Sequence, residues 1–180
     1  MPTERKEIRI TGKGGQGIVL AGKIMGKAAV YDGRYAIQTA SYGAEARGTT
    51  ARSDIIISDR NIAFPQVRSC NILIAMSQTA LQTHLKSLGQ DGSLLVDPDL
   101  IKETPTFPGK TFNIPANRTS EGELGCPLYA NMVMLGALTK ITRIVTPEAV
   151  EKAIADYVRP DDLQNNLKAF KLGLSLPIHR

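Results

Sequence analysis

The stretch RITGKGGQGIVLAGK, residues 9–23, places four glycines within the six residues 12–17, directly after a short apolar run. Glycine loses more conformational freedom on folding than any other residue, so a cluster of this kind needs a reason. One reason is a bound phosphate that backbone N–H groups approach closely at the start of a helix. The other is a tight turn from a strand into a helix, with no ligand involved. Both interpretations predict a strand before this glycine loop (residues 12–17) and a helix after it.

The rest of the chain predicts an α/β fold, namely a three-layer, Rossmann-like domain with a mostly parallel sheet. Apolar strands are expected at residues 6–11, 35–40, 51–59, 71–77 and 92–100. Helices are expected at residues 17–33, 78–89, 126–141, 146–158 and 161–176, so the C-terminal third is helical. Residues 106–124 are rich in turn formers and predict one edge strand near residues 110–115. Gly22 and Gly26 predict close packing of the first helix on the sheet.

Length and composition indicate an ordinary globular protein with one domain over residues 1–180. The 180 residues are 42% hydrophobic and 22% charged. No uncharged apolar stretch is long enough to span a bilayer, and the charged start has no apolar leader region, so we expect a cytoplasmic protein with no membrane partner. Cys70 and Cys126 are isolated, and His84 and His179 lack a ligand pattern, so we expect no metal or iron–sulfur cluster in this chain.

The positive charge is concentrated near the glycine loop. The net charge is +5, and residues 1–60 carry ten Lys and Arg against six Asp and Glu. A positive field there suits an anionic ligand. Nucleic acid is the alternative ligand of a basic chain, but runs of Lys and Arg interleaved with aromatic residues are missing, so we expect no nucleic-acid partner.

The glycine loop fits the pattern G-x-G-x-x-G between a strand and a helix, which is the context of a dinucleotide-binding fingerprint. That fingerprint also requires an acidic residue at the end of the second strand, to bind a ribose. Asp32 is the nearest acid and falls at the end of the first helix instead, which disfavours NAD. Lys13 does not stand in a G-K-[ST] pattern, so a P-loop is excluded.

Three further positions could belong to a site beside this loop. The segment SYGAEARG, residues 41–48, follows the second strand, so it is expected to open at the same sheet edge as the glycine loop, between two buried strands. Its Arg47 could hold a phosphate or carboxylate, with Glu45 orienting it, or the two could form a self-contained salt bridge. Asn131 lies in the first turn of an apolar helix, where it could cap a loop or face the crevice. Ser77 follows a strand and is either at this edge or a helix N-cap.

Several stretches, taken in order, resemble the gamma subunit of 2-oxoacid:ferredoxin oxidoreductases. They are GKGGQGIVLAGKIMGKAA (12–29), SYGAEARG (41–48), SDIIISD (53–59), ILIAMSQ (72–78) and NMVMLGAL (131–138), followed by Asn166, Ala169, Phe170 and Gly173. The segment at 40–59 is typical of the 2-oxoglutarate branch, although Thr49 replaces a usual glycine. The pyruvate branch more usually has FGPERRG.

The resemblance implies a subunit of an enzyme that converts a 2-oxoacid, coenzyme A and an oxidised acceptor into acyl-CoA, carbon dioxide and reduced ferredoxin. It implies no cofactor bound by this chain alone, coenzyme A at the crevice, and thiamine diphosphate and iron–sulfur clusters on alpha-, beta- and delta-type partner subunits. No catalytic residue is assigned. The positions implied to face a ligand or a subunit are Gly12, Gly14, Gly15, Gln16, Gly17, Tyr42, Gly43, Glu45, Arg47, Gly48 and Asn131.

Two other functions stay open on the residues alone: a stand-alone nucleotide-binding dehydrogenase or flavoprotein, and an anion- or nucleic-acid-binding module. The helix at residues 127–138 carries more apolar residues than one buried stripe needs. Such an excess predicts a contact with a partner chain.

Overall fold

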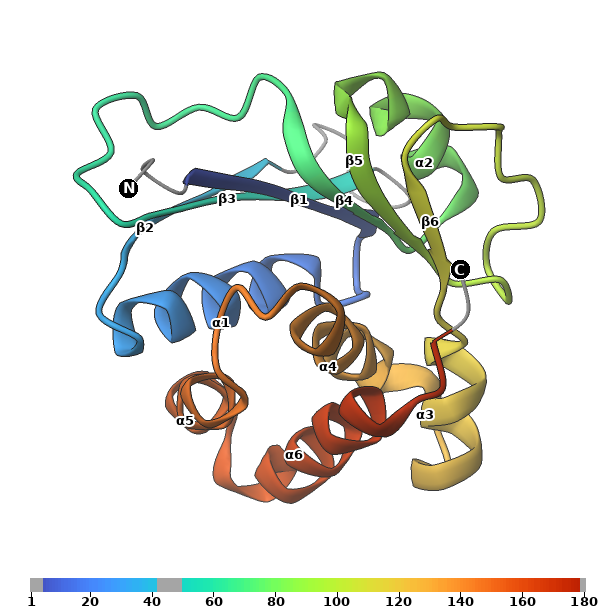
Figure 1. The fold of residues 1–180 in the computed structure, drawn as a ribbon. Helices are drawn as coiled ribbons and strands as arrows, with labels where there is room; N and C mark the ends of the chain where they lie inside the picture. The colour runs from blue at the N-terminus through green and yellow to red at the C-terminus, as the bar shows by residue number, and fades with distance from the viewer. Residues whose placement is uncertain (1–4, 42–49, 179–180) are drawn as a thin grey trace.

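The computed structural model describes residues 5–41 and 50–178, which form one six-stranded sheet with helices on both faces (Figure 1). The strands are β1 (Arg5–Lys13), β2 (Tyr35–Ser41), β3 (Thr50–Ser58), β4 (Cys70–Ala75), β5 (Leu88–Val96) and β6 (Lys110–Asn113). The α-helices are α1 (Ile18–Tyr31), α2 (Gln78–His84), α3 (Ala116–Leu124), α4 (Ala130–Thr142), α5 (Pro147–Tyr157) and α6 (Pro160–Ser175). Short 3-10 turns, η1 (Leu85–Ser87) and η2 (Pro127–Tyr129), follow α2 and precede α4.

The sheet has the order β2-β3-β1-β4-β5-β6, and the expectation of a mostly parallel sheet is confirmed. β3 runs antiparallel to both of its neighbours, while the β1–β4, β4–β5 and β5–β6 pairs are parallel. β1 and β2 therefore run in the same direction and end at the same edge, which we call the carboxyl edge. The expectation that β2 is buried was wrong, because β2 is the outer strand and most of its residues are half-buried or exposed.

The layers agree with the three-layer domain that the sequence predicts. Figure 1 shows α1, α4, α5 and α6 on one face of the sheet, and α2 on the other. The helical face is two helices deep, because α4 lies between the sheet and α6. A smaller apolar cluster packs under α2 on the opposite face, around Leu73, Leu81 and Val96.

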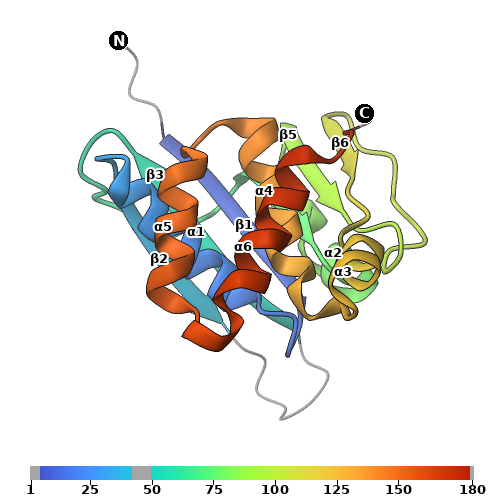
Figure 2. The same ribbon diagram turned by 90° about the horizontal axis from the view of Figure 1, so that it is seen from below.

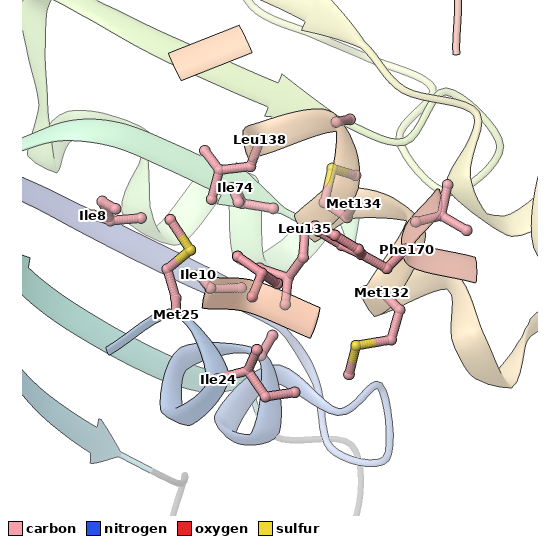
Figure 3. Close-up of a cluster of buried hydrophobic side chains, with 14 of the residues drawn as sticks. Ile8, Ile10, Ile24, Met25, Ile74, Met132, Met134, Leu135, Leu138 and Phe170 are labelled. Carbon is pink, nitrogen blue, oxygen red and sulfur yellow. The ribbon is translucent and has the colours of Figure 1, made fainter. Parts of the chain in front are cut away.

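The central position of helix α4 explains why it has so many apolar residues. Each of its residues 130–139 is buried, with Leu135 and Leu138 facing Ile10 and Ile74 of the sheet and Phe170 of α6 nearby (Figure 3). A helix covered by a sheet on one side and a helix on the other needs apolar residues all round. The apolar excess of α4 is therefore used within the chain and is not itself evidence of a partner contact. Pro127 and Leu128, just before the helix, are exposed, and Leu128 is 63% exposed.

Glycines allow the close packing of α4 on α6 and of α1 on the sheet. A Cβ on Gly136 would overlap the carbonyl oxygen of Phe170, and a Cβ on Gly173 would overlap that of Val133. A Cβ on Gly22 would overlap the hydroxyl of Ser53 on β3. The expected close approach of α1 to the sheet is thus confirmed at Gly22.

Helix α3 differs from the sequence prediction, which had a turn-rich segment there. Its residues are mostly half-buried or exposed, with Ala116 and Ser120 buried, and they carry no apolar stripe. The helix begins where the carboxylate of Asp97 accepts from the backbone N–H of Asn117 at 2.7 Å, and Asp99 accepts from that of Arg118 at 3.2 Å. Both acceptors come from the segment that directly follows β5, so local sequence patterns do not reveal this cap. Burial raises the pKa of Asp97, although the hydrogen bonds that it accepts from the backbone N–H groups of Asp99 and Asn117 act in the opposite direction.

Candidate functional site

The glycine loop connects the carboxyl end of β1 to the start of α1 (Figure 2). Gly15 and Gly17 adopt φ values of 91° and 68°, which residues with side chains rarely adopt. Gly17 provides no side-chain cap to α1, and the first turn of that helix carries no acidic residue. The helix therefore presents its positive N-terminal end at the loop without an acidic side chain in its own first turn.

Gln16 folds back over the loop and bonds at both ends of its amide. Its Oε1 accepts from the backbone N–H of Lys13 at 2.6 Å, and its Nε2 donates to the carbonyl of Met76 at 2.8 Å. Met76 in turn donates its backbone N–H to Thr11 at 2.8 Å, which continues the β1–β4 pairing. The amide of Gln16 thus joins the loop to the end of β4.

Asn131 reaches the same loop from α4. Its Nδ2 donates to the carbonyl of Gly17 at 3.3 Å, and its Oδ1 accepts from the backbone N–H of Met132 at 2.9 Å. Its side chain therefore caps the loop, which is one of the two roles that the sequence suggested for it. Asn131 also lines the space beside the loop, so it has the second suggested role, facing the crevice, as well.

Two cavities flank the loop at the carboxyl edge, and we call them together the candidate crevice. One has a volume of about 360 Å³ and includes Gln16, Met76 and Cys126 in its lining. The other has a volume of about 230 Å³ and includes Gly17, and its remaining lining includes Leu20, Tyr129, Tyr157, Arg159, Asp162 and Asn166. Both are lined by Gly15, Leu128 and Asn131.

The segment 42–49 lies outside the described residues, so the predicted positions Tyr42, Gly43, Glu45, Arg47 and Gly48 are not placed. The described residues on either side of it lie at the carboxyl edge, because Ser41 pairs with Arg52 and Thr50 pairs with Lys13.

Two other residues singled out in the sequence have structural roles. The hydroxyl of Ser77 accepts from the backbone N–H of Ala80 at 3.3 Å, so Ser77 is the N-cap of α2. Asp32 accepts two hydrogen bonds from Thr146, at the start of α5. The acid nearest to a ribose position is thus bound within the fold, which agrees with the argument against a dinucleotide site.

The sequence did not point to Leu128, Tyr157 or Arg159 as crevice residues. Leu128 and Tyr157 are 63% and 44% exposed, which is unusual for large apolar and aromatic side chains in this chain. The signal in the sequence was weak, because the crevice wall comes from η2 and from the α5–α6 junction, more than 100 residues after the loop.

A buried ion pair lies on the other face of the sheet. Arg9 donates from Nε and Nη2 to the two carboxylate oxygens of Asp54, at 2.7 and 2.8 Å, and each residue is 6% exposed. Burial, and then the positive charges of Arg9 and Arg52, lower the pKa of His84 nearby. This cluster contributes to the fold, and none of its members lines the candidate crevice.

A larger cavity of about 760 Å³ lies at the opposite, amino edge of the sheet, where Lys6, Lys110 and Ile178 are among its lining residues. Across residues 5–41 and 50–178, no group of three or more His, Cys, Asp or Glu is placed to hold a metal ion. Within these same ranges, no helix combines the length and apolar character that crossing a membrane requires.

Comparison with known proteins gives matches over nearly the whole chain. The family model for pyruvate ferredoxin/flavodoxin oxidoreductase matches residues 7–176. The 2-oxoglutarate synthase subunit KorC of Methanothermobacter thermautotrophicus is 50% identical over 179 residues, which cover 96% of this chain and 95% of that protein. The pyruvate synthase subunit PorC of Methanocaldococcus jannaschii is 33% identical over 170 residues, which cover 93% and 94%.

Solved structures have the same fold. The gamma subunit of a keto/oxoacid ferredoxin oxidoreductase from Geobacter sulfurreducens has a TM-score of 0.83 and 40% identity, covering 93% of this chain and 95% of its own. The 2-oxoglutarate:ferredoxin oxidoreductase of Magnetococcus marinus, solved with 2-oxoglutarate, coenzyme A and succinyl-CoA bound, has a TM-score of 0.86 at 21% identity. The match covers 96% of this chain and 31% of that longer chain. The chain therefore belongs to the pyruvate ferredoxin/flavodoxin oxidoreductase family, as one of its gamma subunits.

Proposed function

We propose that this chain is the gamma subunit of a 2-oxoglutarate:ferredoxin oxidoreductase. The assembled enzyme converts 2-oxoglutarate and coenzyme A into succinyl-CoA and carbon dioxide, and passes two electrons to ferredoxin. The observation that carries the proposal is the 50% identity to a 2-oxoglutarate synthase subunit over almost the full length of both chains. The 33% identity to a pyruvate synthase subunit is lower, which favours 2-oxoglutarate as the oxoacid.

Within that enzyme, we propose that the candidate crevice binds coenzyme A. Backbone N–H groups at a helix N-terminus suit the phosphates of coenzyme A, since the helix dipole and the N–H donors both favour negative charge. The larger of the two cavities beside the loop is lined in part by Leu128, Met76 and Ala130, which suits a flexible apolar chain such as the pantetheine arm. Arg47 and Glu45 stay proposed members of this site, together with Tyr42, Gly43 and Gly48.

The remaining parts of the enzyme belong, in this proposal, to other chains. Alpha-, beta- and delta-type subunits carry thiamine diphosphate and the iron–sulfur clusters, and the complex passes electrons to ferredoxin in the cytoplasm. The chain contributes a single gamma-type domain over residues 1–180. Accordingly, the isolated chain does not turn over 2-oxoglutarate with coenzyme A and a viologen dye. Turnover at the rate of the complete complex would contradict the proposed division of roles.

Gly14, the neighbour of the crevice residue Gly15, offers a test of whether the ligand approaches the loop backbone. A Cβ at Gly14 would meet no atom of the described chain within 4 Å, and its φ lies outside the left-handed region. Gly14→Ala is therefore expected to fold and assemble normally. If coenzyme A approaches the loop backbone, the added methyl group raises the KM for coenzyme A several-fold and leaves the KM for 2-oxoglutarate unchanged.

The matched control is Gly122→Ala, since Gly122 lies on α3 and is also open to solvent. Steady-state kinetics on the assembled complex, with its melting temperature, separate the outcomes. A Gly14→Ala complex that forms poorly, with normal kinetics in the fraction that assembles, would identify the loop as a subunit contact instead.

A further inference from the structure

We infer that Gln16 and Asn131 are positioning residues that hold the glycine loop in shape from inside and do not contact the bound anion. The inference rests on the proposed function for what the loop binds. It assigns the ligand-facing part of the loop to the backbone of Gly14 and Gly15. The two side chains that the resemblance placed in the crevice then act through that backbone.

Gln16 is committed to the protein at both ends of its amide. The oxygen accepts from Lys13 at 2.6 Å and the nitrogen donates to Met76 at 2.8 Å. The first bond closes the turn from within, and the second fixes that turn to the end of a neighbouring strand. A ligand that bonded to this amide would have to compete with two short backbone contacts.

Asn131 fixes the other end of the loop. Its nitrogen donates to the carbonyl of Gly17, and its oxygen accepts from the N–H of Met132. Its side chain belongs to a helix that is buried between the sheet and α6, and only 5% of the residue is exposed. The loop is therefore held between a rigid helix on one side and the end of β4 on the other.

At two of the four glycines, the amides occupy space that a side chain would need. A Cβ on Gly12 would lie 2.5 Å from Oε1 of Gln16, and a Cβ on Gly17 would overlap Nδ2 of Asn131. By contrast, a Cβ on Gly14 or Gly15 would meet nothing within 4 Å. The glycine cluster therefore has two functions: Gly12 and Gly17 make room inward, whereas Gly14 and Gly15 lie on the open side.

The test is hydrogen–deuterium exchange on the assembled, ligand-free complex carrying Gln16→Met. Methionine has a similar length and no charge, and it removes both hydrogen bonds. We expect the backbone amides of residues 13–17 to exchange at least tenfold faster, with a several-fold higher KM for coenzyme A and an unchanged KM for 2-oxoglutarate. Gln90→Met, at an exposed position on the amino edge, is the matched control.

Asn131→Ala is a second, independent variant, because it leaves Gln16 intact and is expected to loosen the same amides. A raised KM for coenzyme A with unchanged exchange in the ligand-free complex would show direct ligand contact and overturn the inference. Unchanged exchange with unchanged KM would overturn it too. Faster exchange with an unchanged KM would support the internal role of the amides and instead refute coenzyme A binding at the loop.

Discussion

Both carboxylate oxygens of Asp32 accept hydrogen bonds from Thr146, one from the backbone N–H at 2.7 Å and one from the hydroxyl at 2.6 Å. The same hydroxyl accepts from the N–H of Ala149 at 3.3 Å and caps α5. The end of α1 is thereby joined to the beginning of a helix 114 residues later.

Asp32→Ala is expected to lower the free energy of unfolding by about 1–2 kcal/mol, because two charge-assisted bonds and the orientation of a helix cap are lost. The KM for coenzyme A should not change, since Asp32 does not line the candidate crevice. Urea denaturation of the purified chain measures the first effect, with Asp91→Ala as an exposed control. An equal loss in both variants would show that the contact with Thr146 contributes nothing.

Gly136→Ala is expected to destabilise the chain by about 1–3 kcal/mol, because the new methyl group meets the backbone of α6 and cannot be accommodated by a side-chain rotation. Gly122→Ala should have the opposite sign and stabilise α3 by about 0.5–1 kcal/mol, as alanine does at an open helix position. Thermal unfolding of the two variants compares them directly. Equal melting temperatures would refute the close α4–α6 packing.

Asp54→Asn should lower the free energy of unfolding by about 3–5 kcal/mol, because it leaves the buried guanidinium of Arg9 without its counter-charge. Asp162→Asn removes the charged partner of the exposed Arg159 and should cost about 1 kcal/mol or less. Chemical denaturation of both variants makes the comparison. If the two losses were alike, the Arg9–Asp54 pair would be no more important to stability than a surface pair.

The stability of the chain should fall as the pH is lowered from 7 to 5, in part because of His84. Its pKa is lowered in the folded state, by burial first and then by Arg9 and Arg52, so the unfolded chain binds a proton more readily in this window. Stability therefore rises with pH until His84 is neutral in both states. Urea midpoints across this range should show a smaller slope for His84→Gln, and an unchanged slope would rule out the contribution.

Local patterns were enough to predict the β1–loop–α1 unit and the edge strand β6, and they gave the N-cap at Ser77 as one of two alternatives. Those features depend on residues that lie next to one another in the chain. Helix α3 was missed because its start is capped by Asp97 and Asp99, which come from the segment that directly follows β5. The outer position of β2 was missed because strand order is set by the whole sheet.

The candidate site divides in the same way. The spacing of the glycines was enough to find the loop, but the contacts that require glycine at each position could not be predicted. The partner of Gln16 is a carbonyl at position 76, and the neighbour of Gly17 is a side chain at position 131, so both contacts depend on tertiary packing. Leu128 was not singled out because an exposed leucine looks the same in sequence as a buried one.

Lys6 and Ile178 line one and the same cavity at the amino edge, so the two ends of the described chain lie on the side of the sheet opposite the glycine loop (Figure 2). A polypeptide joined to either end would leave from that side. The gamma fold can thus be fused into a longer chain without passing new sequence across the crevice. For the same reason, an affinity tag or a fluorescent label at either terminus should leave coenzyme A kinetics untouched.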